Sequence, residues 1–258
     1  MTKKKSIYLK ETDLCTAFLE KVPDEWTAYP ETNGFDIFLV RSDGFQIGIE
    51  AKLKLNAKVI SQAAEKTSSW YADRRGPDCR AVLVPEKTGG DLIHVCELLG
   101  ITVIKMKEPP EFEYIRHSRW FYPSLPKESG IYGGTYDDWF QFFPAERMKV
   151  PKYIPDVVAG DSSPVALTHW KIKAIKLHIT LEKRGFLCRQ DFKFFGISIS
   201  RWICPYSQWL VNTQRGVWIA GKHLPDFKSQ HPTNYDEIAA DYEEWKNPEQ
   251  PKVQGKLL

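Results

Sequence analysis

The sequence has few cysteines and no long apolar run. Its 5 cysteines among 258 residues are an odd number and include no CxxC pair, so neither a disulfide framework nor a cysteine zinc site is expected. No stretch approaches the ~20 apolar residues that a membrane span needs. The first ten residues are polar and lysine-bearing, without the apolar segment of a signal peptide. We therefore expect a cytoplasmic protein with reduced thiols and no membrane partner.

Several common enzyme signatures are also missing. The 6 histidines show no metal-ligand spacing, and the chain has no phosphate-binding Walker loop, dinucleotide glycine fingerprint or nucleophile elbow. Nothing in the sequence therefore indicates nucleotide hydrolysis. Hydrophobic residues make up 42% and charged residues 27% of the chain, which is typical of a globular protein and not of a disordered one.

The small net charge of +3 hides a strong local imbalance. Residues 167–224 contain 10 basic and only 2 acidic residues, whereas residues 225–258 contain 4 basic and 7 acidic ones. A basic excess within one short segment is expected of a module that binds a polyanion, because each neutralised phosphate releases condensed counterions. A solvated basic face without a ligand is the alternative.

Prolines and aromatic residues interrupt the regular patterns between residues 107 and 164. Floppy linkers are depleted in aromatic residues, so this stretch is expected to be ordered and to pack against a neighbouring domain. The chain is therefore divided into an α/β domain over 1–108, a Pro/aromatic-rich connector over 109–165, a basic domain over 166–224 and an acidic C-terminal tail over 225–258. Periodicity predicts these elements of the first domain: helices 10–21, 56–74 and 92–99, and strands 26–30, 35–41, 45–53, 80–84 and 101–105.

One predicted strand breaks its own apolar pattern with two charges. Glu50 and Lys52 are two residues apart, so they point to the same face of the sheet with Cα atoms roughly 6.5 Å apart. A three-residue loop over 42–44, with Gly44 in the left-handed position, would pair Arg41 with Phe45 and place Asp36 opposite Glu50. Cross-strand Cβ atoms are about 5 Å apart, so the two carboxylates could share one divalent cation.

Two alternatives to this site stay open. A two-residue turn at Asp43-Gly44 would shift the register and turn Asp36 away. Glu50 and Lys52 would otherwise form an exposed ion pair on an edge strand, which contributes little to stability.

The chain carries Asp36 on one predicted strand, Glu50-Ala51-Lys52 on the next strand and Gln62 on the helix that follows. This arrangement resembles the PD-(D/E)xK nuclease superfamily, also called restriction-endonuclease-like. The order helix, three strands, helix, strand over about 100 residues is similar to the core of that fold. The resemblance implies that Asp36 and Glu50 ligate Mg²⁺, with Mn²⁺ as a substitute, that Lys52 assists the attacking water, and that Gln62 supports the site. An acid on the first helix often joins such sites, and Glu20 fits best, with Glu11 a poorer second. The chain departs from the pattern at Phe35, where the family name has proline.

The basic segment has a second pattern. A helix from about residue 169 to 184 ends at Gly185, and a short helix, a turn at Gly196 and a second helix with Ser198 near its N-cap follow. This resembles a helix-turn-helix, and the strand-like runs 208–213 and 217–220 around Arg215 complete a winged-helix pattern with a basic tip. The expected DNA-contacting residues are Lys193, Ser198, Ser200, Arg201 and Arg215. A helical domain used for protein contacts is the alternative.

Together these patterns predict an α/β chain with a restriction-endonuclease-like mixed sheet flanked by helices, plus a C-terminal winged-helix domain. The function that this combination implies is an Mg²⁺-dependent deoxyribonuclease that binds double-stranded DNA and hydrolyses its phosphodiester bonds. The alternative is a non-catalytic DNA-binding regulatory or architectural protein with a degenerate nuclease fold. A symmetric double-strand cut would need two active sites, so a homodimer is compatible with this function, and the architecture would suit a bacterial or phage protein.

Overall fold

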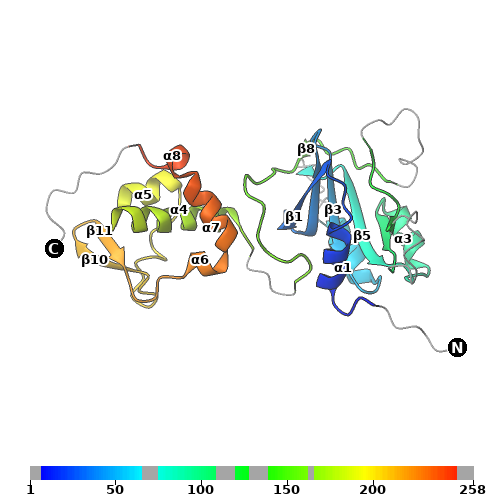
Figure 1. Cartoon of the computed structure of the whole chain (residues 1–258), viewed down its shortest axis with the longest axis horizontal. Helices are drawn as coiled ribbons and strands as arrows, with labels where there is room; N and C mark the ends of the chain where they lie inside the picture. The colour runs from blue at the N-terminus through cyan, green and yellow to red at the C-terminus, as the bar shows by residue number, and fades with distance from the viewer. Residues whose placement is uncertain (1–6, 66–74, 109–119, 128–138, 162–165, 249–258) are drawn as a thin grey trace. The chain divides into compact units, whose positions relative to one another are not determined.

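A computed structural model of the chain describes residues 7–65, 75–108, 120–127, 139–161 and 166–248. The chain divides into two compact units, Met1–Pro164 and Val165–Leu258 (Figure 1). No helix in the described ranges is long and apolar enough to cross a membrane.

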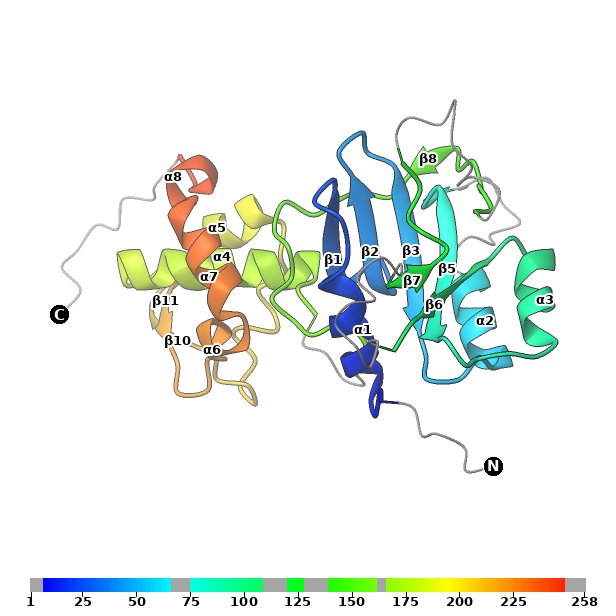
Figure 2. The same ribbon diagram turned by 45° about the vertical axis from the view of Figure 1, so that its right-hand side comes forward.

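The first unit is built on a six-stranded mixed sheet in the order β1-β2-β3-β5-β6-β7 (Figure 2). The first three strands are antiparallel, β3, β5 and β6 run parallel to one another, and β7 closes the edge antiparallel to β6. The strands are β1 (Trp26–Thr32), β2 (Phe35–Arg41), β3 (Gln46–Ala51), β5 (Cys79–Pro85), β6 (Thr102–Met106) and β7 (Phe121–Tyr122). All five strands expected from the sequence of this domain are present.

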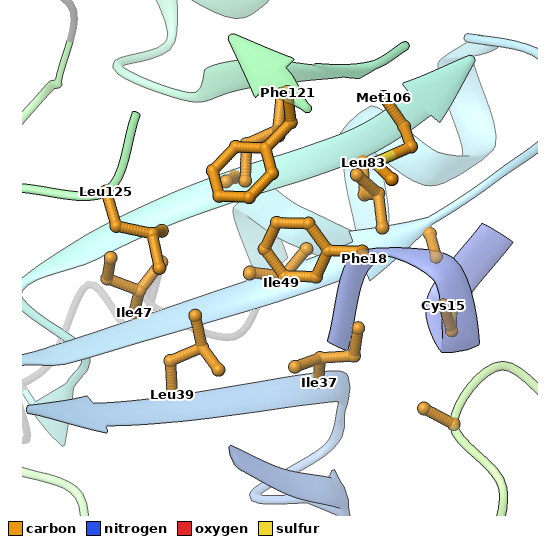
Figure 3. Packing of buried hydrophobic residues seen from close by; sticks show 14 of the residues in the cluster. Cys15, Phe18, Ile37, Leu39, Ile47, Ile49, Leu83, Met106, Phe121 and Leu125 are labelled. Carbon is orange, nitrogen blue, oxygen red and sulfur yellow. The ribbon is translucent and has the colours of Figure 1, made fainter. Parts of the chain in front are cut away.

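Helices cover both faces of this sheet. Phe18 of α1 (Glu11–Leu19) packs on a core to which β3 contributes Ile47, Ile49 and Ala51 (Figure 3). The alternate residues of β3, Gly48 and Glu50, therefore point to the opposite face. That face is covered by α2 (Ala57–Glu65) and α3 (Leu92–Leu98), whose apolar residues pack against Val82 and Val84 of β5. The second half of the long helix expected over 56–74 lies outside the described residues.

The described parts of the connector belong to the first unit. Its β7 adds a strand to the sheet, and Leu125 and Trp139 are buried in the core on the α1 side. Arg75–Gly76 (β4) pairs in parallel with Glu146–Arg147 (β8), and a salt bridge of 2.8 Å joins Arg75 to Glu146. Phe121 and Trp139 are thus aromatic residues of this stretch that belong to the core of the first unit. The rest of the expected connector over 109–119 and 128–138 lies outside the described residues.

The second unit combines helices with a small sheet in the order β10-β11-β9. The long α4 (His169–Arg184) begins at Thr168, whose hydroxyl caps it, and ends at Gly185 in the left-handed conformation (φ +82°). The hairpin of β10 and β11 turns at Arg215-Gly216, as expected. The remaining elements up to this hairpin are β9 (Leu187–Cys188), α5 (Arg189–Phe195), β10 (Leu210–Gln214) and β11 (Val217–Ala220).

The second helix expected from Ser198 does not form. Gly196 makes the turn as predicted (φ +59°), but the chain beyond it makes two separate turns instead of a helix. The amide of Trp202 bonds the carbonyl of Ile199 in the first turn, and the amide of Ser207 bonds the carbonyl of Cys204 in the second. Pro205 limits the length of the first turn, because it disfavours helical backbone at the residue before it. The Ser198 hydroxyl bonds that of Ser200 at 2.7 Å.

The segment expected to be an acidic tail is largely helical. It contains α6 (Phe227–Gln230), α7 (Pro232–Ala240) and α8 (Tyr242–Trp245). α6 and α7 both contact α4. Two lysines of α4 contact aromatic rings of α8: Lys176 lies over the ring of Trp245 and Lys183 over that of Tyr242.

Candidate functional site

The β2–β3 hairpin sets two carboxylates opposite each other. Ile37 pairs with Ile49, and the amide of Arg41 bonds the carbonyl of Phe45 at 2.8 Å. The loop over 42–44 has three residues, with Gly44 in the left-handed conformation (φ +85°). This confirms the expected register, which places Asp36 across from Glu50, and excludes the two-residue turn.

Arg41 and Asp43 hold this loop in shape. Both guanidinium donors Nε and Nη2 of Arg41 bond the Asp43 carboxylate, at 3.0 and 2.7 Å, and the same carboxylate accepts the amide of Phe45. The hydrogen bonds from Arg41 lower the pKa of Asp43 to about 2, and the Phe45 amide adds to the effect. The register of the two site strands is therefore fixed by side chains as well as by Gly44.

Asp36 and Glu50 differ in their surroundings. The Asp36 carboxylate accepts a hydrogen bond of 2.7 Å from the amide of Ala51, which ties it to the neighbouring strand next to Glu50. Glu50 is only 2% exposed. A buried carboxylate requires compensation by a cation or by hydrogen bonds, because removal of a charge from water is costly.

Lys52 brings the positive charge of the site. Its ammonium lies 2.5 Å from the carboxylate of Glu11, the first residue of α1. Burial alone would lower the pKa of Lys52, but the hydrogen bond to Glu11 and the negative charges of Asp36, Glu11 and Glu50 raise it overall. Lys52 is therefore an ammonium at neutral pH, suited to attract a phosphate and not to act as a base.

The acid that α1 contributes is Glu11, not Glu20. Glu20 follows the last residue of α1, its side chain is 64% exposed, and its neighbour is Lys21 at 4.0 Å. Nine residues of α-helix separate the two acids by about 13 Å along the axis. The structure thus places Glu11, the poorer candidate from the sequence, next to Lys52, and it places Glu20, the better candidate from the sequence, outside the site.

A third carboxylate, Glu31 on β1, was missed by the sequence analysis. Pro30 pairs with Ile37 and Thr32 with Phe35, so the same register sets Glu31 opposite Asp36. The loop between the two strands is Asn33-Gly34, with positive φ at both residues (54° and 85°). Asn-Gly is the strongest short hairpin signal in a sequence, and it could have located Glu31 by the same counting that located Glu50.

Glu31 is held in an unusual environment. Its Oε1 accepts a hydrogen bond of 2.8 Å from the amide of Gly160, and its own φ is +47°. Burial raises the pKa of Glu31 to about 7; the Gly160 hydrogen bond opposes this rise, and the charges of Asp36 and Glu50 add to it. Glu31 thus changes its charge close to neutral pH.

Substitution of Glu31 by glutamine is expected to stabilise the protein at pH 8 but not at pH 4. Because the folded-state pKa of about 7 exceeds the ordinary value of 4.5, the folded state binds more protons between these values, and stability falls as pH rises through them. With allowance for solvent screening, E31Q should gain about 1 kcal/mol in free energy of unfolding at pH 8 relative to pH 4. Urea unfolding at both pH values measures this gain, with E20Q as the exposed control. An equal effect of E31Q at the two pH values would contradict the assignment.

Gln62 lies on α2, which contacts β3 and β5. Its Oε1 is buried and has no hydrogen-bond partner among the residues that the structure describes. An unsatisfied buried carbonyl oxygen costs about 1–3 kcal/mol, so this atom is suited to accept a donor or a cation. No described contact links Gln62 to Asp36 or Glu50.

The donor set of this site fits a hard divalent cation. Among the described residues, no three His, Cys, Asp or Glu side chains are grouped closely enough to hold a metal ion. Mg²⁺ does not need three, because it commonly uses one or two carboxylates and completes its octahedron with water and phosphate oxygens. Asp36 and Glu50 are such a pair, and the low exposure of Glu50 favours a nearby positive charge.

The residues expected to contact DNA all lie on the surface of the second unit. Ser200 and Arg201 lie in the turn that is closed on the carbonyl of Ile199, and Ser198 directly precedes this turn. Lys193 lies in the last turn of α5. Arg215 stands at the tip of the β10–β11 hairpin. The structure therefore exposes these residues, but it does not place three of them on a regular helix.

No protein-family model, curated protein or solved structure matches this chain.

Proposed function

We propose that this chain is a divalent-metal-dependent deoxyribonuclease. The observation that carries the proposal is the facing pair Asp36 and Glu50 on adjacent strands, with Lys52 two residues after Glu50. Two acids and a lysine in this arrangement resemble the PD-(D/E)xK centre. The antiparallel β1–β2–β3 followed by the parallel β5, with helices before and after, supports the corresponding restriction-endonuclease-like fold.

The residues of the chain divide the work of hydrolysis. Asp36 and Glu50 would hold the metal ion, which when bound lowers the pKa of a water molecule and polarises a phosphate. The Lys52 ammonium offsets negative charge that develops on the phosphate oxygens. Glu11 orients that ammonium through its contact of 2.5 Å.

The second unit supports a DNA-binding role. Its order of helix, strand, helix, turn and hairpin, with β9 joined to β11 and not to β10, resembles a winged helix. Irregular turns replace the expected second helix, so the exposed hairpin with Arg215 at its tip is the better candidate for contacting the duplex. Two-stranded ribbons fit the major groove.

The rival function is a non-catalytic DNA-binding protein. The Glu11–Lys52 ion pair favours it, because it partly neutralises the ammonium that the chemistry needs.

Metal-dependent cleavage discriminates between the two functions. Purified protein is expected to cut closed circular or linear DNA with Mg²⁺ or Mn²⁺, and to leave it intact but bound when the metal is chelated. Gel electrophoresis of both substrates measures cutting, and a filter-binding assay measures how much DNA the protein binds. DNA that stays intact with either metal while remaining bound would favour the rival.

A further inference from the structure

Arg201 of the second unit rests on two indole rings. Its guanidinium carbon lies 5.1 Å from the ring centre of Trp170 and 5.1 Å from that of Trp209. Trp209 in turn contacts the fully buried Trp202, with ring centres 5.5 Å apart. Arg201 itself is exposed. The aromatic base therefore holds an exposed guanidinium in a defined orientation.

Lys171 is a second cation next to Arg201. Its ammonium lies 5.4 Å from the ring centre of Phe227 and donates a hydrogen bond of 2.6 Å to Oε1 of Gln230. Burial lowers the pKa of Lys171, and the positive charge of Arg201 lowers it further. Phe227 under Lys171 and Trp209 under Arg201 have ring centres 6.5 Å apart, so the two cations lie on neighbouring parts of one aromatic cluster, where their like charges repel each other.

No carboxylate of the described residues forms an ion pair with either cation. Other cations of the same unit do pair: Arg184 with Asp191, Lys228 with Asp236 and Lys246 with Glu243. Lys171 and Arg201 instead contact aromatic rings and one amide, which hold their positions without neutralising them. An anion placed between them would relieve the repulsion and gain two charge-assisted contacts.

We propose that Lys171 and Arg201 form a clamp for a phosphodiester group of the DNA backbone. The planar fork of arginine matches two phosphate oxygens, and lysine adds a point charge. The guanidinium is exposed, so a continuous strand has access to it. The clamp takes its ligand from the proposed DNA-binding role, but it does not depend on cleavage.

The clamp narrows the DNA contact that the sequence predicted for Arg201 to a contact with the backbone. A backbone contact positions the protein and carries no sequence information. Ser198 and Ser200 bond each other, and the turn that bears Arg201 is no groove-filling helix. Binding through this site should therefore be insensitive to DNA sequence and sensitive to salt.

The test is a fluorescence-anisotropy titration of labelled duplex DNA over a range of salt concentrations, in chelator. The variants K171Q and R201Q are each expected to bind more weakly and to lower the salt slope by about one unit. R201K keeps the charge but not the fork, so it should keep the slope and lose about tenfold in affinity. Thermal melting confirms that each variant is folded.

K183Q is the matched control, because Lys183 is an exposed lysine at the opposite end of the same helix, over Tyr242. It should bind with the wild-type slope. An equal fall in slope for K183Q would indicate a diffuse basic face and overturn the clamp, as would wild-type binding by both K171Q and R201Q.

Competitors identify the source of the phosphate. Closed circular DNA, which has no ends, is expected to compete fully, whereas inorganic phosphate and a 5′-phosphorylated mononucleotide are not. Competition only by 5′-phosphorylated ends or free phosphate would overturn the phosphodiester assignment, and a preference for RNA would overturn DNA as the ligand.

The clamp and the hydrolase proposals can fail separately. Clamp-dependent binding without cleavage would support the clamp and overturn the hydrolase alone, whereas a wild-type chain that binds no nucleic acid would overturn both.

Discussion

Substitution of Glu50 by glutamine is expected to reduce metal-dependent DNA cleavage by about 10³-fold or more. The change keeps the shape of the side chain and removes one of the two facing carboxylates. Glu50 is 2% exposed and follows the core strand residues Ile47 and Ile49, so the neutral variant should fold at least as stably as the wild type. Initial rates at saturating Mg²⁺ measure the loss, and thermal melting monitors the fold.

Glu20 provides the control for this experiment. E20Q removes the same charge from the same unit, but at a side chain that is 64% exposed, and it should cut DNA at the wild-type rate. Duplex affinity in chelator should be unchanged in both variants, because the proposed DNA contacts lie in the second unit. Cleavage by E50Q within tenfold of the wild type would contradict the metal-ligand role. A parallel loss of DNA affinity would show that Glu50 serves binding instead of chemistry.

The local part of this site could be predicted from the sequence because hairpin geometry is local. Gly44 fixes a three-residue loop, the loop fixes the register, and the register sets Asp36 opposite Glu50. Glu31 is accessible to the same logic through Asn33-Gly34. When the strand registers are derived from both loops, Glu31, Asp36 and Glu50 occupy paired positions across β1, β2 and β3.

The choice between Glu11 and Glu20 could not be made in this way. Glu11 and Glu20 lie at opposite ends of the same helix. The packing of α1 across the sheet decides which of its ends reaches Lys52. That packing is a tertiary property, decided by the fit of Leu14 and Phe18 into the core. Periodicity identifies the buried face of a helix but not its direction across a sheet.

Other differences have similar causes. β7 and β8 are two residues long and exist only through pairing with distant β6 and β4, so no local pattern reveals them. The acidic composition of residues 225–258 led to the expectation of a tail instead of helices, although α7 has a buried face that includes Tyr235 and Ile238. The shortened turn before Pro205, in contrast, could have been foreseen from the proline rule.

Phe35 and Gly48 form a pair that explains two irregularities of the sequence at once. A Cβ atom on Gly48 would lie 2.4 Å from Cζ of Phe35 and 2.6 Å from both of its Cε atoms. Glycine inside a strand normally weakens it, and here it makes room for the phenyl ring that occupies the position before Asp36. Phe35 is 1% exposed and stacks on Phe38 with ring centres 6.3 Å apart, so it cannot easily move aside.

G48A is therefore expected to destabilise the protein by about 2 kcal/mol, because overpacking of a buried ring outweighs the better strand propensity of alanine. F35L alone should cost about 1 kcal/mol through the lost ring volume. In the double variant the leucine leaves space for the new methyl group, so the two effects should fall short of their sum by about 1 kcal/mol or more. Urea unfolding of the wild type, the two single variants and the double variant measures the four free energies of this double-mutant cycle. Additive effects, or a G48A protein more stable than the wild type, would show that the ring adapts and that the glycine has another cause.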